Sequence, residues 1–245
     1  MRFASFRYAS LALGAALVAL AGCSQPADPA ADTSQAAAPA KPAEPSQALD
    51  TYRQLVRIGN DEMAVTVGKD ILSRAPDSAA AKEVQQSLPA IEKRWTETSE
   101  KNRLQALWLY QTSPMEGGTQ STATIYSTRP SGEQMVRLIL RRHTAWGQSV
   151  FLFGSGHGFV CKGNCTINAK FDDSTRPIKA FLPTTGEPAM FIRDDVAFIK
   201  ALQKAKKITL EVTSADRGKQ TLVYEVAGFQ PDKWAAVGKG SGKAK

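Results

Sequence analysis

The sequence contains few of the residues that most often perform catalysis or bind metal ions. Its 245 residues include two histidines, His143 and His157, and three cysteines. Acid–base and nucleophilic catalysis need a histidine or a thiol beside a suitable partner. His143 has no acidic or nucleophilic residue nearby in the sequence, and Ser155 is so close to His157 in sequence that the two rarely reach a catalytic geometry. We therefore expect a protein that is not an enzyme, with no catalytic residue, no metal-binding residue and no cofactor.

Long hydrophobic runs are also missing beyond the N-terminal region. A membrane-spanning helix needs about 18 or more apolar residues, and no run after residue 22 approaches that length. No nucleic-acid-binding motif is present, so we expect no nucleic-acid partner. The formal net charge of +8 favours anionic envelope polymers or lipid headgroups as partners, although an excess of this kind also serves solubility alone.

The N-terminus has the parts of an export signal. Arg2 and Arg7 supply positive charge, and residues 11–20 form an apolar core that is followed by small residues. A core of about ten residues is too short to span a bilayer and is typical of a signal peptide. We expect residues 1–22 to be removed on export.

The tetrapeptide Leu20-Ala21-Gly22-Cys23 resembles the lipobox of bacterial lipoproteins. The resemblance implies that Cys23 is acylated and that its lipid holds the chain at a membrane. Ser24 after the cysteine implies sorting to the outer membrane, with the protein facing the periplasm. The alternatives are an ordinary secretory signal and an uncleaved anchor.

Two further segments lack periodic apolar residues. Residues 23–46 are nearly all Ala, Pro, Ser, Gln and Asp, and residues 236–245 are mostly Gly, Lys, Ser and Ala. Such compositions bury too little apolar surface to offset the entropy of ordering. They predict a lipidated, disordered tether over 23–46 and a disordered basic tail over 236–245.

Residues 47–103 carry apolar side chains at helical spacing. Capping residues predict breaks at Asn60-Asp61 and at Pro76-Asp77-Ser78. Residues 71–82 resemble the junction between tetratricopeptide helices, but a solenoid needs about three repeats, so we favour a helical hairpin. The apolar positions are Leu49, Tyr52, Leu55, Val56, Met63, Val67, Ile71, Leu72, Val84, Leu88, Ile91 and Trp95.

Residues 104–235 consist of short strand-like runs separated by Gly, Pro, Asp and Ser clusters. Strands at this spacing indicate an antiparallel sandwich or barrel. The predicted fold class is α+β, with an N-terminal helical hairpin segment followed by an antiparallel β-sandwich domain with one crossing helix. The runs are residues 106–110, 122–128, 135–140, 149–153, 165–171, 178–182, 189–192, 208–213 and 221–226.

The crossing helix follows two acidic residues. Asp194 and Asp195 can cap its N-terminus and complement its dipole. We expect it to pack across an open end of the sheets. Its predicted apolar stripe is Val196, Ile199, Leu202 and Ala205.

The two remaining cysteines flank a turn-forming segment. Cys161 and Cys165 enclose Lys162-Gly163-Asn164, and an even pair in an oxidising compartment favours a disulfide. A zinc site would need further ligands, for which only the two histidines are available. A redox-active pair is the other alternative, although the usual motif has two intervening residues on a helix N-terminus.

Four other features invite a functional reading. His143, which follows Arg141 and Arg142 at a strand end, is expected at the surface or rim, and His157 is expected in a flexible glycine-rich turn with Ser155. Asp172-Asp173 is either a carboxylate pair for acid–base chemistry or, as we favour, a turn. Three tryptophans, Trp108, Trp146 and Trp234, offer either a sugar-stacking surface or core packing, and Trp108 in a strand favours the core.

The order of motifs from residue 160 to residue 229 resembles a known class of domain. It comprises the two cysteines, the strand 166–173, Phe191-Ile192-Arg193-Asp194, the helix 198–207 and the strand 208–212. This order resembles the β-sandwich of proteobacterial envelope proteins, including the invasion-associated locus B family and lipoproteins that accompany type VI secretion. The resemblance implies a non-enzymatic periplasmic module.

These observations predict a membrane-anchored periplasmic lipoprotein that acts as a scaffold or interaction module for an envelope protein partner. The alternative is a binding module for an anionic envelope polymer such as peptidoglycan or lipopolysaccharide. A hydrolase built on Ser155, His157 or the Asp172–Asp173 pair is a third, weaker hypothesis.

Overall fold

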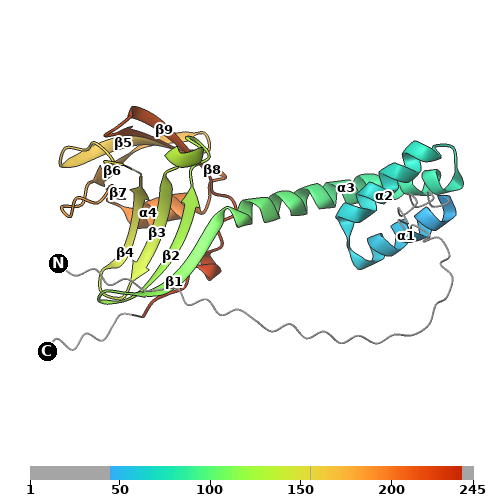
Figure 1. Cartoon of the computed structure of the whole chain (residues 1–245), viewed down its shortest axis with the longest axis horizontal. Helices are drawn as coiled ribbons and strands as arrows, with labels where there is room; N and C mark the ends of the chain where they lie inside the picture. The colour runs from blue at the N-terminus through green and yellow to red at the C-terminus, as the bar shows by residue number, and fades with distance from the viewer. Residues whose placement is uncertain (1–44, 155, 239–245) are drawn as a thin grey trace, which may run out of the picture. The chain divides into compact units, whose positions relative to one another are not determined.

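The computed structural model describes residues 45–154 and 156–238, and Figure 1 shows the whole chain. The predicted signal peptide, the lipidation site Cys23, residues 23–44 of the predicted tether and residues 239–245 of the predicted tail lie outside the described residues. Pro45 and Ser46, which we assigned to the tether, begin the first helix. The described chain has the predicted α+β class.

The helical segment consists of three helices, α1 (Pro45–Ile58), α2 (Asp61–Arg74) and α3 (Ala79–Ala106). Both predicted breaks are confirmed. Asn60 Oδ1 accepts a hydrogen bond from the Met63 backbone N–H at 3.2 Å, and Ser78 Oγ accepts one from Ala81 N–H at 3.1 Å. These side chains satisfy backbone donors that the first turn of a helix leaves free.

The three helices bury their own apolar cluster. Tyr52 of α1, Ile71 of α2 and Val84 of α3 are among its buried members. Gly68 permits this packing, because a Cβ atom there would lie 3.0 Å from both Leu88 Cδ1 and Tyr52 Cε2. A side chain at this position would force these neighbouring side chains to shift.

The strands form one antiparallel sheet in the order β1-β2-β3-β4-β7-β6-β5-β8-β9. The order shows that β7 connects the two halves of the sheet, since it pairs with β4 and with β6. Figure 1 shows the sheet curving so that its halves face each other. The strands are β1 (Trp108–Met115), β2 (Gly118–Tyr126), β3 (Arg137–His143), β4 (Gly147–Phe153), β5 (Asn164–Phe171), β6 (Ser174–Phe181), β7 (Ala189–Ile192), β8 (Lys207–Ser214) and β9 (Gly218–Glu225).

The segment after β2 brings the ends of the sheet together. Thr128 N–H donates to the Val223 carbonyl at 2.7 Å, and Val223 N–H donates to the Arg129 carbonyl at 2.9 Å. These bonds occupy part of the β9 edge. A single continuous sheet therefore encloses the core in a sandwich-like arrangement, with residues of both halves in one buried cluster.

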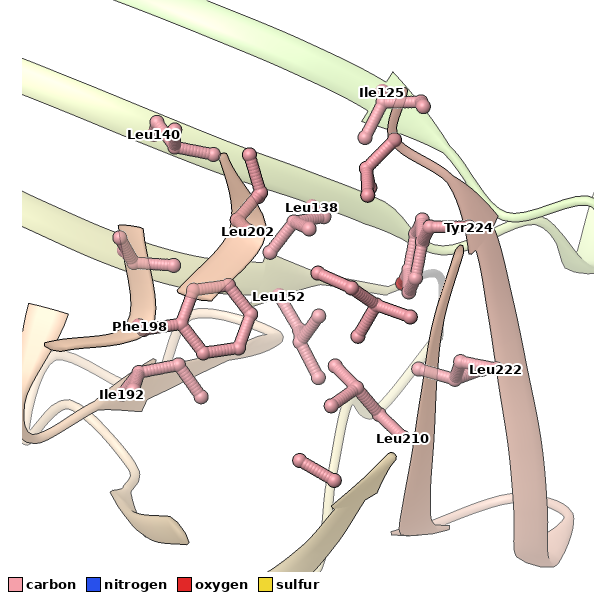
Figure 2. Close-up of a cluster of buried hydrophobic side chains, with 14 of the residues drawn as sticks. Ile125, Leu138, Leu140, Leu152, Ile192, Phe198, Leu202, Leu210, Leu222 and Tyr224 are labelled. Carbon is pink, nitrogen blue, oxygen red and sulfur yellow. The ribbon is translucent and has the colours of Figure 1, made fainter. Parts of the chain in front are cut away.

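The helix α4 (Asp195–Leu202) lies between β7 and β8 in the chain and contributes side chains to this core. Figure 2 shows Phe198 and Leu202 pointing toward Leu138 and Leu152. The predicted stripe was wrong at Val196, which is 51% exposed, and it omitted Phe198, which is 2% exposed. The N-cap prediction is confirmed, because Asp194 Oδ1 accepts from Ala197 N–H at 2.9 Å.

Candidate functional site

The cysteine pair forms the predicted disulfide. Cys161 and Cys165 are joined with an S–S distance of 2.04 Å, and Cys165 lies at the start of β5. Both residues pack against the main core cluster. The bond therefore joins the segment that precedes β5 to the strand itself, at the edge of the hydrophobic core.

His143 is not a surface residue, contrary to the sequence-based expectation. It is 2% exposed, at the end of β3. Its Nδ1 accepts hydrogen bonds from the backbone N–H groups of Ala145 and Trp146 at 3.1 and 3.2 Å, and its ring stacks on Trp146 with centroids 3.9 Å apart. An accepting Nδ1 places the proton of the neutral ring on Nε2. The histidine thus holds the turn between β3 and β4.

His157 is exposed, and its partner is one that the sequence did not reveal. The Asp216 carboxylate accepts from the His157 backbone N–H at 2.9 Å and contacts its Nδ1 at 2.5 Å. The backbone hydrogen bond and then the side-chain hydrogen bond hold the pKa of Asp216 below its usual value. The pair joins the loop after β4 to the β8–β9 turn. Ser155 lies outside the described residues.

The two carboxylates after β5 are occupied with structural contacts. Asp172 has a positive φ of 50° in the hairpin turn between β5 and β6. Its carboxylate accepts from the backbone N–H groups of Lys206 and Lys207 at 2.9 Å each. Asp173 lies 3.7 Å from Lys170 and is exposed. The arrangement is that of a turn, as we favoured from the sequence.

The three tryptophans do not form a common surface. Trp108 and Trp234 are 4% and 2% exposed, and each lies close to Phe229, with centroids 4.9 and 6.2 Å apart. Trp146 is half exposed, on the turn that His143 holds. Two of the three rings are therefore core residues, as the sequence favoured for Trp108, and the three do not form a shared sugar-stacking surface.

A surface that sequence reasoning missed lies on the outer side of the sheet, opposite the core. Cross-strand pairing places Ile139 beside Phe151, Phe151 beside Phe191, and Phe191 beside Phe181. The rings of Phe151 and Phe191 stack with centroids 4.8 Å apart, and those of Phe181 and Phe191 with centroids 5.4 Å apart. The result is a row of aromatic rings across β4, β7 and β6.

Three arginines lie over phenylalanine rings on this side of the sheet, two of them over the row. Arg141 is 5.1 Å from the Phe151 ring centroid and 5.9 Å from that of Phe191. The guanidinium of Arg193 lies 4.3 Å from the Phe181 ring, and that of Arg137 lies 4.5 Å from the Phe153 ring. We call this surface the arginine–aromatic face; its residues are Arg137, Arg141, Phe151, Phe153, Phe181, Phe191 and Arg193.

The positive charge of this face is not neutralised by ion pairs. Within residues 45–154 and 156–238, none of the three arginines has a carboxylate oxygen within 4.0 Å of its guanidinium nitrogens. Arg141 donates to Ser149 Oγ at 3.2 Å. Burial lowers the pKa of Arg141 below its usual value, and the nearby charge of Glu187 acts in the opposite direction.

The comparisons with known proteins add no relative. No protein-family model matches the chain, and neither a curated protein nor a solved structure matches it. In the described part of the chain, no helix has both the length and the apolar character needed to cross a membrane. Among the same residues, no three histidine, cysteine, aspartate or glutamate side chains are grouped so as to hold a metal ion.

Proposed function

We propose that the protein is a lipid-anchored, non-enzymatic interaction module of the cell envelope, held at the outer membrane through Cys23 and facing the periplasm. Its arginine–aromatic face binds an acidic, aromatic-containing segment of a protein partner. The single observation that carries this proposal is the group of phenylalanines that lie beneath Arg137, Arg141 and Arg193, three arginines without carboxylate partners in the described chain.

The chemistry of the face supports a protein ligand with carboxylates. An arginine that lies over an aromatic ring still directs guanidinium N–H groups outward, and these can bind a carboxylate in a bidentate geometry. Arg193 donates to Asn164 Oδ1 and Arg141 donates to Ser149 Oγ, so a carboxylate would bind their remaining N–H groups. Aromatic residues and arginines are also the types that contribute most to protein–protein binding. Carboxylates on the partner would complete the charge pairs that the face lacks, while its aromatic groups would cover the partly exposed rings of Phe153, Phe181 and Phe191.

A peptide-binding experiment with the full chain in a neutral detergent tests this proposal. The probes are three labelled peptides of equal length, with Glu–Phe, Lys–Phe and Glu–Ser repeats. We expect the Glu–Phe peptide to bind most tightly, and we expect the double variant Arg137→Gln/Arg193→Gln to weaken that binding at least roughly tenfold. Equal binding of the Glu–Phe and Lys–Phe peptides would overturn the proposal.

A charge-matched control separates the face from the general positive charge of the protein. Lys93 and Lys219 are exposed and lie outside the face, so Lys93→Gln/Lys219→Gln removes the same charge elsewhere. This control variant should keep the affinity of the parent chain. In cells, a photo-crosslinker at Phe181 should capture an acidic segment of an envelope protein. Capture of peptidoglycan or lipopolysaccharide there would favour the polymer-binding alternative instead.

A further inference from the structure

A second feature of the sheet domain is an open cavity of about 410 Å³ between α4 and the β5–β6 hairpin. Its apolar wall includes Phe171 from β5 and Ala197 and Ala201 from α4. A cavity of this volume is in the range that holds a small ligand. It shares no residue with the arginine–aromatic face.

The polar part of the cavity is cationic. Arg176 of β6, Lys200 of α4 and Lys204 just after α4 all line it, and the Arg176 guanidinium lies 4.3 Å from the Phe171 ring. In the part of the chain that the structure describes, none of the three forms an ion pair. Three positive charges around one cavity repel one another, and an anion between them would relieve that repulsion.

The one carboxylate in the lining, Asp172, forms no ion pair with them in the part of the chain that the structure describes. Asp172 directs its oxygens at the backbone N–H groups of Lys206 and Lys207, at 2.9 Å each. The neighbouring carboxylate, Asp173, is turned toward Lys170 at 3.7 Å. Three cationic side chains and one carboxylate line the cavity, so the net charge of its lining is positive.

We propose that this cavity binds the phosphate group of an amphiphilic molecule. Arginine supplies a planar set of donors and lysine a compact charge, and both are common ligands of phosphate oxygens. The wall formed by Phe171, Ala197 and Ala201 contacts the carbon atoms next to the phosphate. A lipid headgroup and a soluble phosphate ester share this chemistry.

Titration of the full chain in neutral detergent micelles tests the site. The probes are inorganic phosphate, hexyl phosphate, dihexanoyl phosphatidic acid and, as a zwitterionic control, dihexanoyl phosphatidylcholine. We expect both phosphate monoesters to bind roughly tenfold or more tightly than inorganic phosphate or the zwitterion, because only they satisfy both the cations and the apolar wall. Tighter binding of phosphatidic acid than of hexyl phosphate would identify a lipid source, and the reverse order a soluble ester. Failure of both monoesters to bind would overturn the proposal.

Two variants make the test specific. The double variant Lys200→Gln/Lys204→Gln should weaken binding of both monoesters at least roughly tenfold, while Lys93→Gln/Lys219→Gln, with the same change in charge, should leave it unchanged. Ala197→Phe should fill the apolar part of the cavity, so that hexyl phosphate loses its advantage over inorganic phosphate. Equal losses in the two lysine double variants would reduce the effect to net charge and would contradict the proposed site.

Discussion

Phe151 of β4 and Phe191 of β7 lie directly opposite each other in the antiparallel pairing of the two strands. Their rings stack with centroids 4.8 Å apart and planes inclined by 25°. They lie on the side of the sheet that faces away from the main core. Phe151 belongs with Ile139 and Ala189 to a separate buried cluster, against which the partly buried Phe191 packs. The sheet is thus apolar on both sides at β4 and β7, where its two halves join.

The first prediction concerns this outer cluster. Phe151 is 8% exposed, so Phe151→Ala should lower the free energy of unfolding by about 3 kcal/mol through lost burial and the cavity left behind. Phe151→Leu should cost much less, because it preserves most of the volume. Denaturant unfolding measures both. A loss below about 1 kcal/mol for Phe151→Ala would show that the outer cluster contributes little to stability.

The second prediction concerns the turn residue Asp172. Its carboxylate accepts two backbone N–H groups while its φ is 50°, a conformation that asparagine and glycine tolerate better than alanine. Asp172→Ala should therefore lose about 2 kcal/mol of stability. Asp172→Gly should lose less stability than Asp172→Ala, because glycine adopts a positive φ without strain. Asp172→Asn should lose the least stability, because its side chain keeps a hydrogen-bond acceptor. A different order in thermal unfolding would contradict this account.

The third prediction concerns the disulfide. The Cys161–Cys165 bond closes a loop with a sequence separation of 4, so its entropic effect on the unfolded chain is small, about 2 kcal/mol. The double variant Cys161→Ala/Cys165→Ala should lose about that amount and remain folded. A reducing agent should lower the free energy of unfolding of the parent chain by the same amount as the double substitution. It should leave the free energy of unfolding of the variant unchanged.

The fourth prediction concerns acid stability. The pKa of Asp216 is lowered in the folded state by hydrogen bonds from His157. A carboxyl group of this kind contributes stability that is present above its unfolded pKa, near 4, and that is lost as the pH falls through the lower folded pKa. Asp216→Asn should therefore flatten this part of the acid limb of the stability curve. The control is Asp232→Asn, at an exposed carboxylate, and an equal effect of both substitutions would contradict the role of Asp216.

Sequence periodicity predicted the strands because one side of each faces the core. Alternation of buried and exposed residues is clear in β8, where Ile208, Leu210 and Val212 are buried. It fails at the far end of β1, where Gln111 and Thr112 are both exposed, so that half of the strand was not predicted. Backbone pairing with β2, which side-chain alternation does not reveal, holds this segment in the sheet.

The sequence did not predict the arginine–aromatic face, because the pattern within single strands does not show which strands are neighbours. Phe151-Leu152-Phe153 is a continuous apolar run, which indicates burial on both sides of a sheet, whereas Arg137 and Arg141 suggested ordinary solvent exposure. Only strand order places these residues beside Phe191 and Phe181, which are far away in sequence. His143 was misplaced likewise, because its burial depends on Trp146 folding back over its ring.

The last prediction concerns the anchor and is independent of the fold. The buried residues of the described chain lie between Leu49 and Trp234, so nothing in those clusters depends on Cys23. The substitution Cys23→Ala should therefore leave the thermal unfolding curve unchanged while moving the protein from the outer-membrane fraction to the soluble periplasmic fraction. Because acyl chains bind a bilayer through buried methylene groups, the parent chain should stay in the membrane pellet at high salt. Retention of Cys23→Ala in that pellet would show that another part of the chain holds the membrane and would contradict the lipid anchor.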